Sequence, residues 1–182
     1  MKKNNKSFTK EDLFNKAYNL HKKGKLQEAN IYYKQFLDRG FEDPSVYLNY
    51  GLSCENSGNI EMSINLYKKC ISKFPNYVAP FVQLSAIYRN KNELKMAENF
   101  LRKAIEFHPN SYQILFNLGN ILKDQKIYKE AEEISIKAYE FNPKDPMINF
   151  NLGDIYFSLG DFIKAKSFIL KSIEYKPNFI YS

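Results

Sequence analysis

The sequence predicts an all-α protein, an α-solenoid of five stacked helix-turn-helix repeats. Four prolines recur at intervals of 34 residues: Pro75, Pro109, Pro143 and Pro177. Five short stretches recur at the same interval: GKLQEA (24–29), GNIEMS (58–63), NELKMA (92–97), KIYKEA (126–131) and GDFIKA (160–165). Only seven Gly and seven Pro occur in 182 residues, which favours long helices with few turns. A fixed period of this length indicates stacked repeats.

The proline column aligns the whole chain without a gap. The repeats are 10–43, 44–77, 78–111, 112–145 and 146–179, between a basic tail (1–9) and the start of an incomplete next helix (180–182). In the fourth repeat, apolar residues recur at helical spacing in two blocks: Leu115, Leu118 and Leu122, then Ala131, Ile134 and Ala138. Each repeat is therefore predicted to hold two amphipathic helices, A and B, which gives ten in all.

Two A helices carry a clear start signal. Asp43 precedes Pro44 and Asp145 precedes Pro146, so each Asp is predicted to cap a helix that has Pro at its first position. The proline near the end of a repeat is predicted to stop helix B, because it has no N–H with which to continue the hydrogen-bond ladder.

The columns of the alignment resemble the tetratricopeptide repeat (TPR) family. Its pattern has a large residue at position 4, Leu at 7, a small residue at 8, Tyr or Leu at 11, Ala at 20, a large residue at 24, Ala at 27 and Pro at 32. The third repeat supplies Phe81, Leu84, Ser85, Tyr88, Ala97, Leu101, Ala104 and Pro109. The fourth supplies Leu115, Leu118, Gly119, Leu122, Ala131, Ala138 and Pro143, and departs with Ser135 at position 24. The resemblance covers 170 of 182 residues and implies a right-handed superhelix whose A helices line a concave groove.

The first and last repeats depart most from this pattern. The first has Lys16 in place of Leu and Phe41 in place of Pro, and the last has Ser172 in place of the second Ala. Terminal repeats are often atypical because one face has no neighbour. The last B helix carries apolar residues that its own A helix cannot all cover: Phe162, Phe168, Ile169 and Ile173. We expect an exposed C-terminal edge, which either continues in a longer natural protein or pairs with another copy.

The residues that usually carry chemistry are sparse. Cys54 and Cys70 stand at positions 11 and 27 of one repeat, which are core positions of the family, so we expect two buried apolar side chains. His21 and His108 are 87 residues apart and lack a second ligand at helical spacing. The glycines occur one at a time, so there is no phosphate-binding loop. We expect no enzyme, no metal and no cofactor.

Charge and hydropathy narrow the class further. The chain has no apolar run of about 18 residues and no signal-peptide core, which predicts a cytoplasmic protein with no membrane partner. Its net charge is +7, but residues 1–9 carry +3 of it and the successive repeats carry +1, +1, +2, −1 and +1. Only three of the 27 cations are Arg. This dispersed, Lys-rich charge disfavours nucleic-acid binding.

Position 6 holds a carboxamide in every repeat: Asn15, Asn49, Gln83, Asn117 and Asn151. At 100 degrees per residue it lies about 150 degrees from the centre of the core face, so these side chains are expected to point away from the core. The neighbouring position 5 is apolar: Phe14, Leu48, Val82, Phe116 and Phe150. Position 9 adds Asn120 and Asp154 as candidate contacts. Duplication of one ancestral repeat would also copy an idle Asn, so the column alone does not prove a role.

A carboxamide both donates and accepts, so a ladder of them suits a peptide backbone of any sequence. The sequence therefore predicts a protein-interaction module that binds an extended polypeptide in its groove. The column is similar to the one that lines the TPR superhelix of O-linked N-acetylglucosamine transferases. The alternative is therefore a substrate-recruiting segment of a larger, glycosyltransferase-like enzyme. RNA binding is a third hypothesis, and the carboxylate clamp of co-chaperones is matched only in part, by Asn120 and Asn151.

Overall fold

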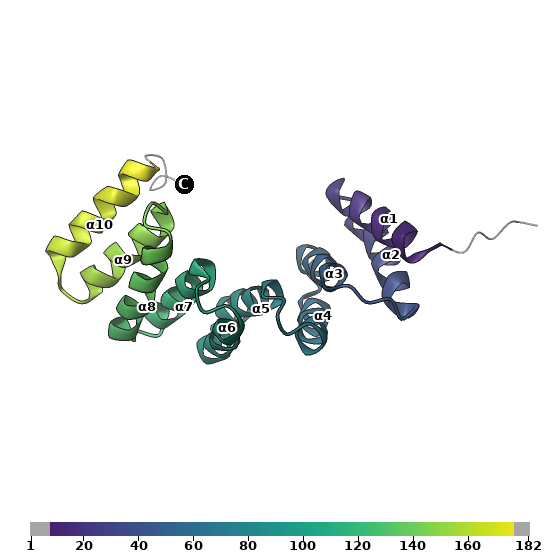
Figure 1. Cartoon of the computed structure of the whole chain (residues 1–182), viewed down its shortest axis with the longest axis horizontal. Helices are drawn as coiled ribbons and strands as arrows, with labels where there is room; N and C mark the ends of the chain where they lie inside the picture. Colours follow the sequence, from purple (N-terminus) through teal and green to yellow (C-terminus); the bar gives the residue numbers. More distant parts are fainter. Residues whose placement is uncertain (1–7, 177–182) are drawn as a thin grey trace, which may run out of the picture. The chain divides into compact units, whose positions relative to one another are not determined.

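The computed structural model describes residues 8–176, which form ten α-helices and no strand (Figure 1). The helices are α1 (Lys10–Lys22), α2 (Leu26–Asp38), α3 (Pro44–Asn56), α4 (Ile60–Lys73), α5 (Ala79–Asn90), α6 (Leu94–Phe107), α7 (Tyr112–Asp124), α8 (Tyr128–Phe141), α9 (Pro146–Ser158) and α10 (Phe162–Tyr175). Each predicted repeat holds two of them, so the all-α prediction of paired helices is confirmed. The predicted incomplete helix at 180–182 and residues 1–7 of the predicted basic tail (1–9) lie outside the described residues.

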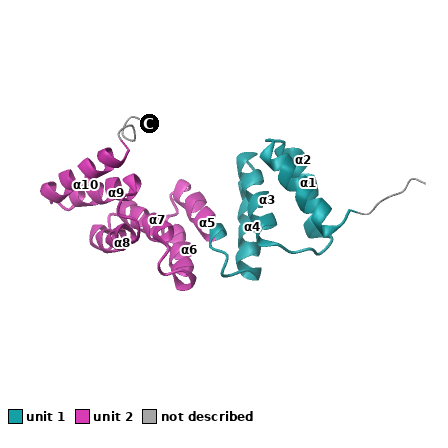
Figure 2. Ribbon diagram, turned by 45° about the horizontal axis from the view of Figure 1, so that its top comes forward, with its two compact units in different colours: residues 1–80 teal, residues 81–182 magenta. Residues whose placement is uncertain are grey.

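The helices group into two compact units (Figure 2): an N-terminal unit of residues 1–80 and a C-terminal unit of residues 81–182. In the N-terminal unit, α1 packs on α2, α2 on α3 and α3 on α4. In the C-terminal unit α6 packs on α7, α7 on α8, α8 on α9 and α9 on α10. A helix therefore contacts its own partner and then the first helix of the next repeat, which is the packing of a helical solenoid. None of the helices in residues 8–176 is long and apolar enough to cross a membrane.

The core of each unit is built from the predicted columns. In the N-terminal unit Leu13, Ala17, Ala29 and Tyr33 are fully buried. Cys54 and Cys70 are buried free thiols, as predicted, and burial raises the pKa of the Cys70 thiol to about 12. One core cluster of the C-terminal unit joins the four helices α7 to α10 of two repeats, through Leu115, Ala138, Ile148, Leu152, Tyr156 and Ala165.

The predicted start signals are confirmed by hydrogen bonds. The Asp43 side chain accepts from the backbone N–H of Ser45 at 2.9 Å, and Pro44 stands at the start of α3. The Asp145 side chain accepts from the N–H groups of Met147 and Ile148 at 2.8 and 3.2 Å. These bonds satisfy donors that the first turn of a helix leaves without an intrahelical acceptor.

The turn between helices A and B has the same backbone conformation in every repeat. Its residue at position 15 has a positive φ: Gly24 (71°), Gly58 (79°), Asn92 (60°), Lys126 (63°) and Gly160 (81°). Gly adopts this left-handed conformation without steric cost and Asn more readily than most residues, whereas Lys is strained in it. The repeated Gly of the aligned stretches therefore has a conformational reason, and Lys126 is the exception.

Replacing Lys126 by glycine should stabilise the C-terminal unit by about 0.5 to 1 kcal/mol, because the relief of left-handed strain exceeds the added entropy of the unfolded chain. Urea unfolding followed by far-UV circular dichroism measures the change. The matched control is Lys137→Gly, an exposed site inside α8, which should cost about 1 kcal/mol. An equal loss in both variants would show that the backbone at residue 126 carries no strain.

Candidate functional site

The five carboxamides of position 6 lie on the A helices but differ in exposure. Asn15 on α1 is exposed, and Asn49 on α3, Gln83 on α5 and Asn117 on α7 are half-buried. Asn151 on α9 is buried, with 2% of its surface exposed. The first two belong to the N-terminal unit and the other three to the C-terminal unit.

Four of these amides keep hydrogen-bonding groups available. Within residues 8–176, the side chains of Asn15, Asn49 and Gln83 make no hydrogen bond to another residue. Asn117 Nδ2 donates to the carbonyl oxygen of Gln113 at 2.8 Å, one turn earlier on the same helix. This bond leaves the Asn117 Oδ1 free to accept. The arrangement therefore offers donors and acceptors along the surface of the A helices.

The prediction that all five amides point away from the core is wrong for Asn151. Its Nδ2 donates to Ser135 Oγ on α8 at 3.2 Å, and its Oδ1 is buried and accepts no hydrogen bond from the described residues. Position 24, where Ser135 stands, holds the larger Tyr67 or Leu101 in other repeats. A Cβ added to Gly119 would lie 3.5 Å from Asn151 Nδ2, so two small residues make room for the amide.

The reason is that a helix in a solenoid is buried on two sides. The helical angle shows only that position 6 points away from the core of its own repeat. Because α9 also packs on α8 of the preceding repeat, a side chain that points away from one helix can be buried against another. Ser135 is the one departure from the family pattern in its repeat, and this departure is the sequence signal for the buried amide. Replacing Asn151 by alanine removes a buried hydrogen bond, so Asn151 is unsuitable for testing a surface role.

The apolar residues of position 5 are shared between the core and the surface. Phe14 packs against the N-terminal core and stacks on Tyr18, with ring centroids 6.1 Å apart. Phe116 packs against the C-terminal core, and Leu48 and Val82 are half-buried. Phe150 is the most open, at 37% exposure. A ligand could therefore contact only the exposed part of each of these side chains.

A surface pocket of about 560 Å³ lies in the N-terminal unit. It is lined by Thr9, Lys10, Glu11, Phe14, Phe36 and Asp43. Phe14 and Phe36 form its apolar wall, and the charged residues form its polar part. It therefore combines one of the predicted position 5 residues with groups able to bind a peptide backbone.

The two candidates at position 9 differ. Asn120 is half-buried, whereas Asp154 on α9 accepts from Lys123 Nζ on α7 at 2.6 Å. A similar pair joins α5 and α7, because Arg89 Nε donates to Asp124 Oδ2 at 2.6 Å. Both ion pairs tie an A helix to the next A helix. Asp154 therefore has a structural partner that the sequence reading did not foresee.

A cluster around one buried carboxylate joins α6 to the end of α7 and to α8. Glu98 on α6 accepts from Arg102 Nε at 2.8 Å, Gln125 Nε2 at 2.9 Å and Lys95 Nζ at 3.0 Å, and Arg102 also donates to Glu130 on α8 at 2.6 Å. Burial alone would raise the pKa of Glu98, but the hydrogen bonds from Gln125, Arg102 and Lys95 outweigh it and lower the pKa to about 2. The cluster lies between repeats and serves packing.

No group of three or more His, Cys, Asp or Glu side chains suited to a metal ion occurs in the described part of the chain. His21 Nδ1 lies 3.3 Å from the hydroxyl of Tyr33, so this ring is part of the packing of α1 on α2. Its burial lowers the pKa of His21.

Comparison with known proteins identifies the repeat. A sequence model of the tetratricopeptide repeat matches residues 44–77, 80–111 and 148–179, and a second one matches residues 100–133. A search of curated proteins finds no match.

Solved structures of MamA share the fold. The chain is similar to residues 41 to the end of MamA from Desulfovibrio magneticus RS-1, with a TM-score of 0.81 and 18% identity over 93% of this chain and 96% of that one. It is also similar to MamA of strain MSR-1, with a TM-score of 0.72 and 21% identity over 93% and 97% of the two chains. At these identities the similarity shows a shared helical solenoid.

Proposed function

The chain belongs to the tetratricopeptide repeat family, and from this membership we propose that it is a protein-interaction module that binds an extended polypeptide along its A helices. The contacts are made by the accessible amides and the apolar residues beside them: Asn15, Asn49, Gln83, Asn117, Phe14, Leu48, Val82, Phe116, Phe150 and Asn120. Asn151 and Asp154 are left out, because the first is buried and the second is paired with Lys123.

The observation that carries the proposal is the unused hydrogen-bonding capacity of the amides. Gln83 and Asn117 occupy the same position of consecutive A helices in the C-terminal unit, and both are half-exposed. A buried amide that serves packing is expected to be paired, as Asn151 is through its Nδ2 and Ser135 Oγ. An amide that donates and accepts can hold a peptide group by two bonds, whatever side chain the peptide carries.

The apolar column supports an extended ligand. Side chains of an extended peptide alternate between two sides, so every second one can reach the edge of Phe116 or Phe150 while the backbone lies over the amides. In the N-terminal unit the pocket beside Phe14 is large enough for one such side chain. This division of roles predicts broad sequence tolerance with a preference for apolar residues at alternate positions.

Replacing both Gln83 and Asn117 by alanine should weaken peptide binding roughly five- to a hundredfold, because each lost amide contact contributes about 0.5 to 1.5 kcal/mol. A fluorescent, unstructured peptide selected from a peptide array on the wild-type chain is the probe, and fluorescence anisotropy measures its affinity. Stability should hold or rise by a few tenths of a kcal/mol, since alanine favours a helix more than either amide.

The matched control is Asn99→Ala, an exposed amide on helix α6, which should leave the affinity unchanged. The proposal fails if the array yields no peptide, or if the double variant binds as tightly as the wild type. A large loss of stability in the double variant would instead assign the two amides to packing.

The substrate-recruiting alternative is a finer version of the same proposal. It rests on similarity to the amide ladder of a transferase superhelix, and the burial of Asn151 shortens that ladder from five amides to four. Reading the gene beyond Ser182 tests it, since a catalytic domain would have to be encoded in the same polypeptide.

A further inference from the structure

The last helix pair presents an apolar surface to solvent. Phe162, Ile163 and Leu170 on α10 are 63%, 86% and 54% exposed. Phe157 on α9 is also exposed, and its ring contacts that of Phe162 at a centroid distance of 5.5 Å. We call these four residues the C-terminal face. Of the four residues expected at an exposed edge, Phe162 is exposed, whereas Phe168, Ile169 and Ile173 are half-buried, and Phe168 stacks on Tyr156.

The equivalent positions of other repeats contact the repeat that follows. Position 17 meets the next A helix in the N-terminal unit, where Leu26 O accepts from Ser53 Oγ at 3.4 Å. Position 25 meets the next B helix, where Arg102 donates to Glu130. Position 12 also contacts the A helix of the next repeat, because Lys123 on α7 donates to Asp154 on α9. Phe162, Leu170 and Phe157 stand at these three positions, so the C-terminal face has the geometry of a surface that receives a helix.

The residue types on this face are not those of a solvated end. Position 18 is Gln27, Glu61, Lys95 and Lys129 in the first four repeats but Ile163 in the fifth. Position 12 is His21, Glu55, Arg89 and Lys123 in the first four but Phe157 in the fifth. At these two positions the last repeat alone carries apolar side chains. Position 18 is exposed in every repeat, so Ile163 extends the apolar surface beyond the positions that contact a following repeat. Exposed apolar clusters of this kind mark interaction sites.

We propose that the C-terminal face binds an amphipathic α-helix of a partner protein, and that this helix carries acidic residues beside its apolar stripe. The A helices that pack on a preceding repeat within the chain show which apolar residues such a helix needs. α7 carries Ile114 and Ile121, and α9 carries Ile148 and Ile155, so each presents two buried isoleucines seven residues apart. The partner helix needs the same spacing, because it packs on the same set of positions.

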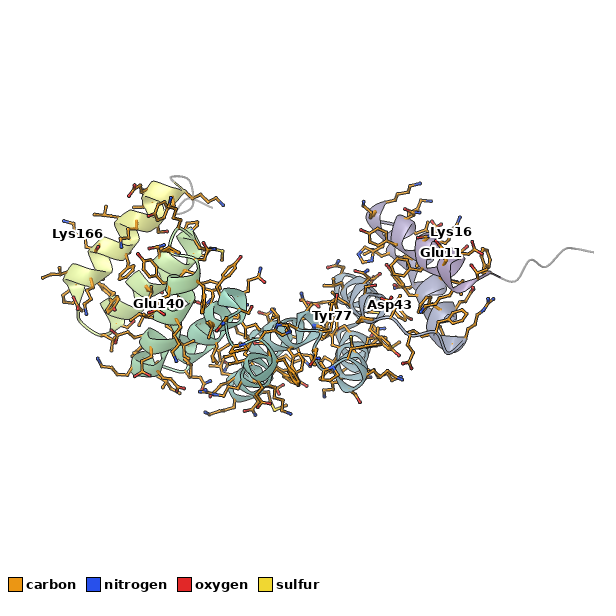
Figure 3. All side chains as sticks on the ribbon, in the orientation of Figure 1. Glu11, Lys16, Asp43, Tyr77, Glu140 and Lys166 are labelled. Carbon is orange, nitrogen blue, oxygen red and sulfur yellow. The ribbon has the colours of Figure 1, made fainter. Side chains whose placement is uncertain are left out.

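The positive charge of α10 favours a partner helix with acidic residues beside its apolar stripe. The helix carries Lys164, Lys166 and Lys171 against Glu174 as its only carboxylate. Lys171 is directed inward, with its Nζ 3.0 Å from the hydroxyl of Tyr139, whereas Lys166 is exposed and lies on the side of α10 turned away from α9 (Figure 3). A carboxylate on the bound helix would therefore meet Lys166 next to Ile163 and Leu170.

A second copy of this chain fits the face poorly. Two α10 helices related by a two-fold axis would bring two Lys166 side chains toward each other. In a head-to-tail contact the face would receive α1, and α1 carries Asp12 and Asn19 at the positions where α7 and α9 have isoleucine. The two-fold arrangement brings like charges together, and the head-to-tail arrangement places polar side chains where the stripe needs apolar ones.

The test uses two synthetic helical peptides with the same pair of isoleucines, one flanked by glutamates and one by lysines, and fluorescence anisotropy with the full chain. The glutamate peptide should bind, and the lysine peptide should bind roughly tenfold more weakly or not at all. Replacing Ile163 and Leu170 by glutamine should weaken the glutamate peptide by roughly tenfold or more, since two apolar contacts are lost. The substitution Lys166→Glu should reduce the difference between the two peptides.

The matched control is Ile31→Gln on α2, where an isoleucine is 57% exposed away from this face, and it should change nothing. All substituted side chains are exposed, so circular dichroism should show unchanged helix content. Equal binding of the two peptides, or binding of neither, overturns the proposal. A dimer in sedimentation that the Ile163 and Leu170 changes abolish would assign the face to a second copy. A rise in affinity on deletion of residues 177–182 would assign it to the chain's own end.

Discussion

Replacing Tyr67 by alanine should lower the free energy of unfolding of the N-terminal unit by about 3 to 5 kcal/mol, the cost of truncating a large buried aromatic side chain. Tyr67 is fully buried on α4, and its hydroxyl donates to Glu55 Oε2 on α3 at 3.1 Å. The ring lies against Gly51 on α3, where an added Cβ would be 2.3 Å from a ring carbon. The Tyr67 ring of α4 therefore packs at the point of α3 where Gly51 has no side chain.

This contact makes the effect of Gly51→Ala depend on Tyr67. In the wild type the substitution should destabilise by about 1 to 3 kcal/mol, because the methyl group overlaps the ring and outweighs the better helix propensity of alanine. In the Tyr67→Ala background it should stabilise by several tenths of a kcal/mol, since the methyl then enters the cavity. The sign reversal is a coupling between two residues in contact.

Urea unfolding followed by far-UV circular dichroism suits this cycle, because the chain has no Trp. The first repeat holds Ala17 and Tyr33 at the same two positions, both fully buried. If Gly51→Ala proves neutral in the wild type, α3 and α4 can move apart far enough to accommodate the added methyl group. That result would contradict the expected overlap between the methyl group and the Tyr67 ring.

The sequence predicted the fold well because its repeat signals are local and are copied five times. The caps at Asp43 and Asp145 and the turns at Gly24, Gly58 and Gly160 depend on a few neighbouring residues, so one reading applies in each repeat. Lys126 is an exception to these local signals. Its residue type gives no sign of the left-handed turn, and only the alignment with glycine in other repeats does.

The candidate site was predicted less well because it depends on contacts between repeats. The helical angle predicts the same outward direction for Asn117 and Asn151. The small Ser135 and Gly119 nevertheless leave room for the Asn151 side chain between helices. The same holds for Asp154, whose partner Lys123 is 31 residues away in the sequence. Such pairs depend on the packing of one repeat on the next, which single-repeat periodicity does not describe.

The Glu98 cluster should make the stability of the C-terminal unit depend on pH. The carboxyl is 8% exposed, and its pKa is lowered from 4.5 to about 2 in the folded chain. A lowered folded pKa means that the unfolded state binds the proton more tightly. The stabilisation is therefore complete above the unfolded value and is lost as the pH falls toward 2. By linkage it amounts to about 3 kcal/mol, an upper figure because Lys95 and Arg102 are partly exposed and screened.

Replacing Glu98 by glutamine isolates this contribution, because glutamine resembles the protonated acid in shape and charge. Near neutral pH the variant should be less stable than the wild type by about 2 to 3 kcal/mol, since Arg102 and Lys95 lose their shared carboxylate. The difference should shrink as the pH falls below about 4.5 and vanish near pH 2. Urea unfolding of both proteins across this range measures it.

The matched control is Glu106→Gln, an exposed carboxylate on the same helix, which should change stability by less than about 0.5 kcal/mol at any pH. A difference between wild type and Glu98→Gln that stays constant with pH would mean that geometry, and not charge, makes Glu98 stabilising. Because Glu98 on α6 meets Gln125 just after α7, and Arg102 reaches Glu130 on α8, a pH-dependent loss would identify one carboxylate as the link between two repeats. Protonation would then loosen the contact of α6 with the fourth repeat, whose A helix α7 carries Asn117.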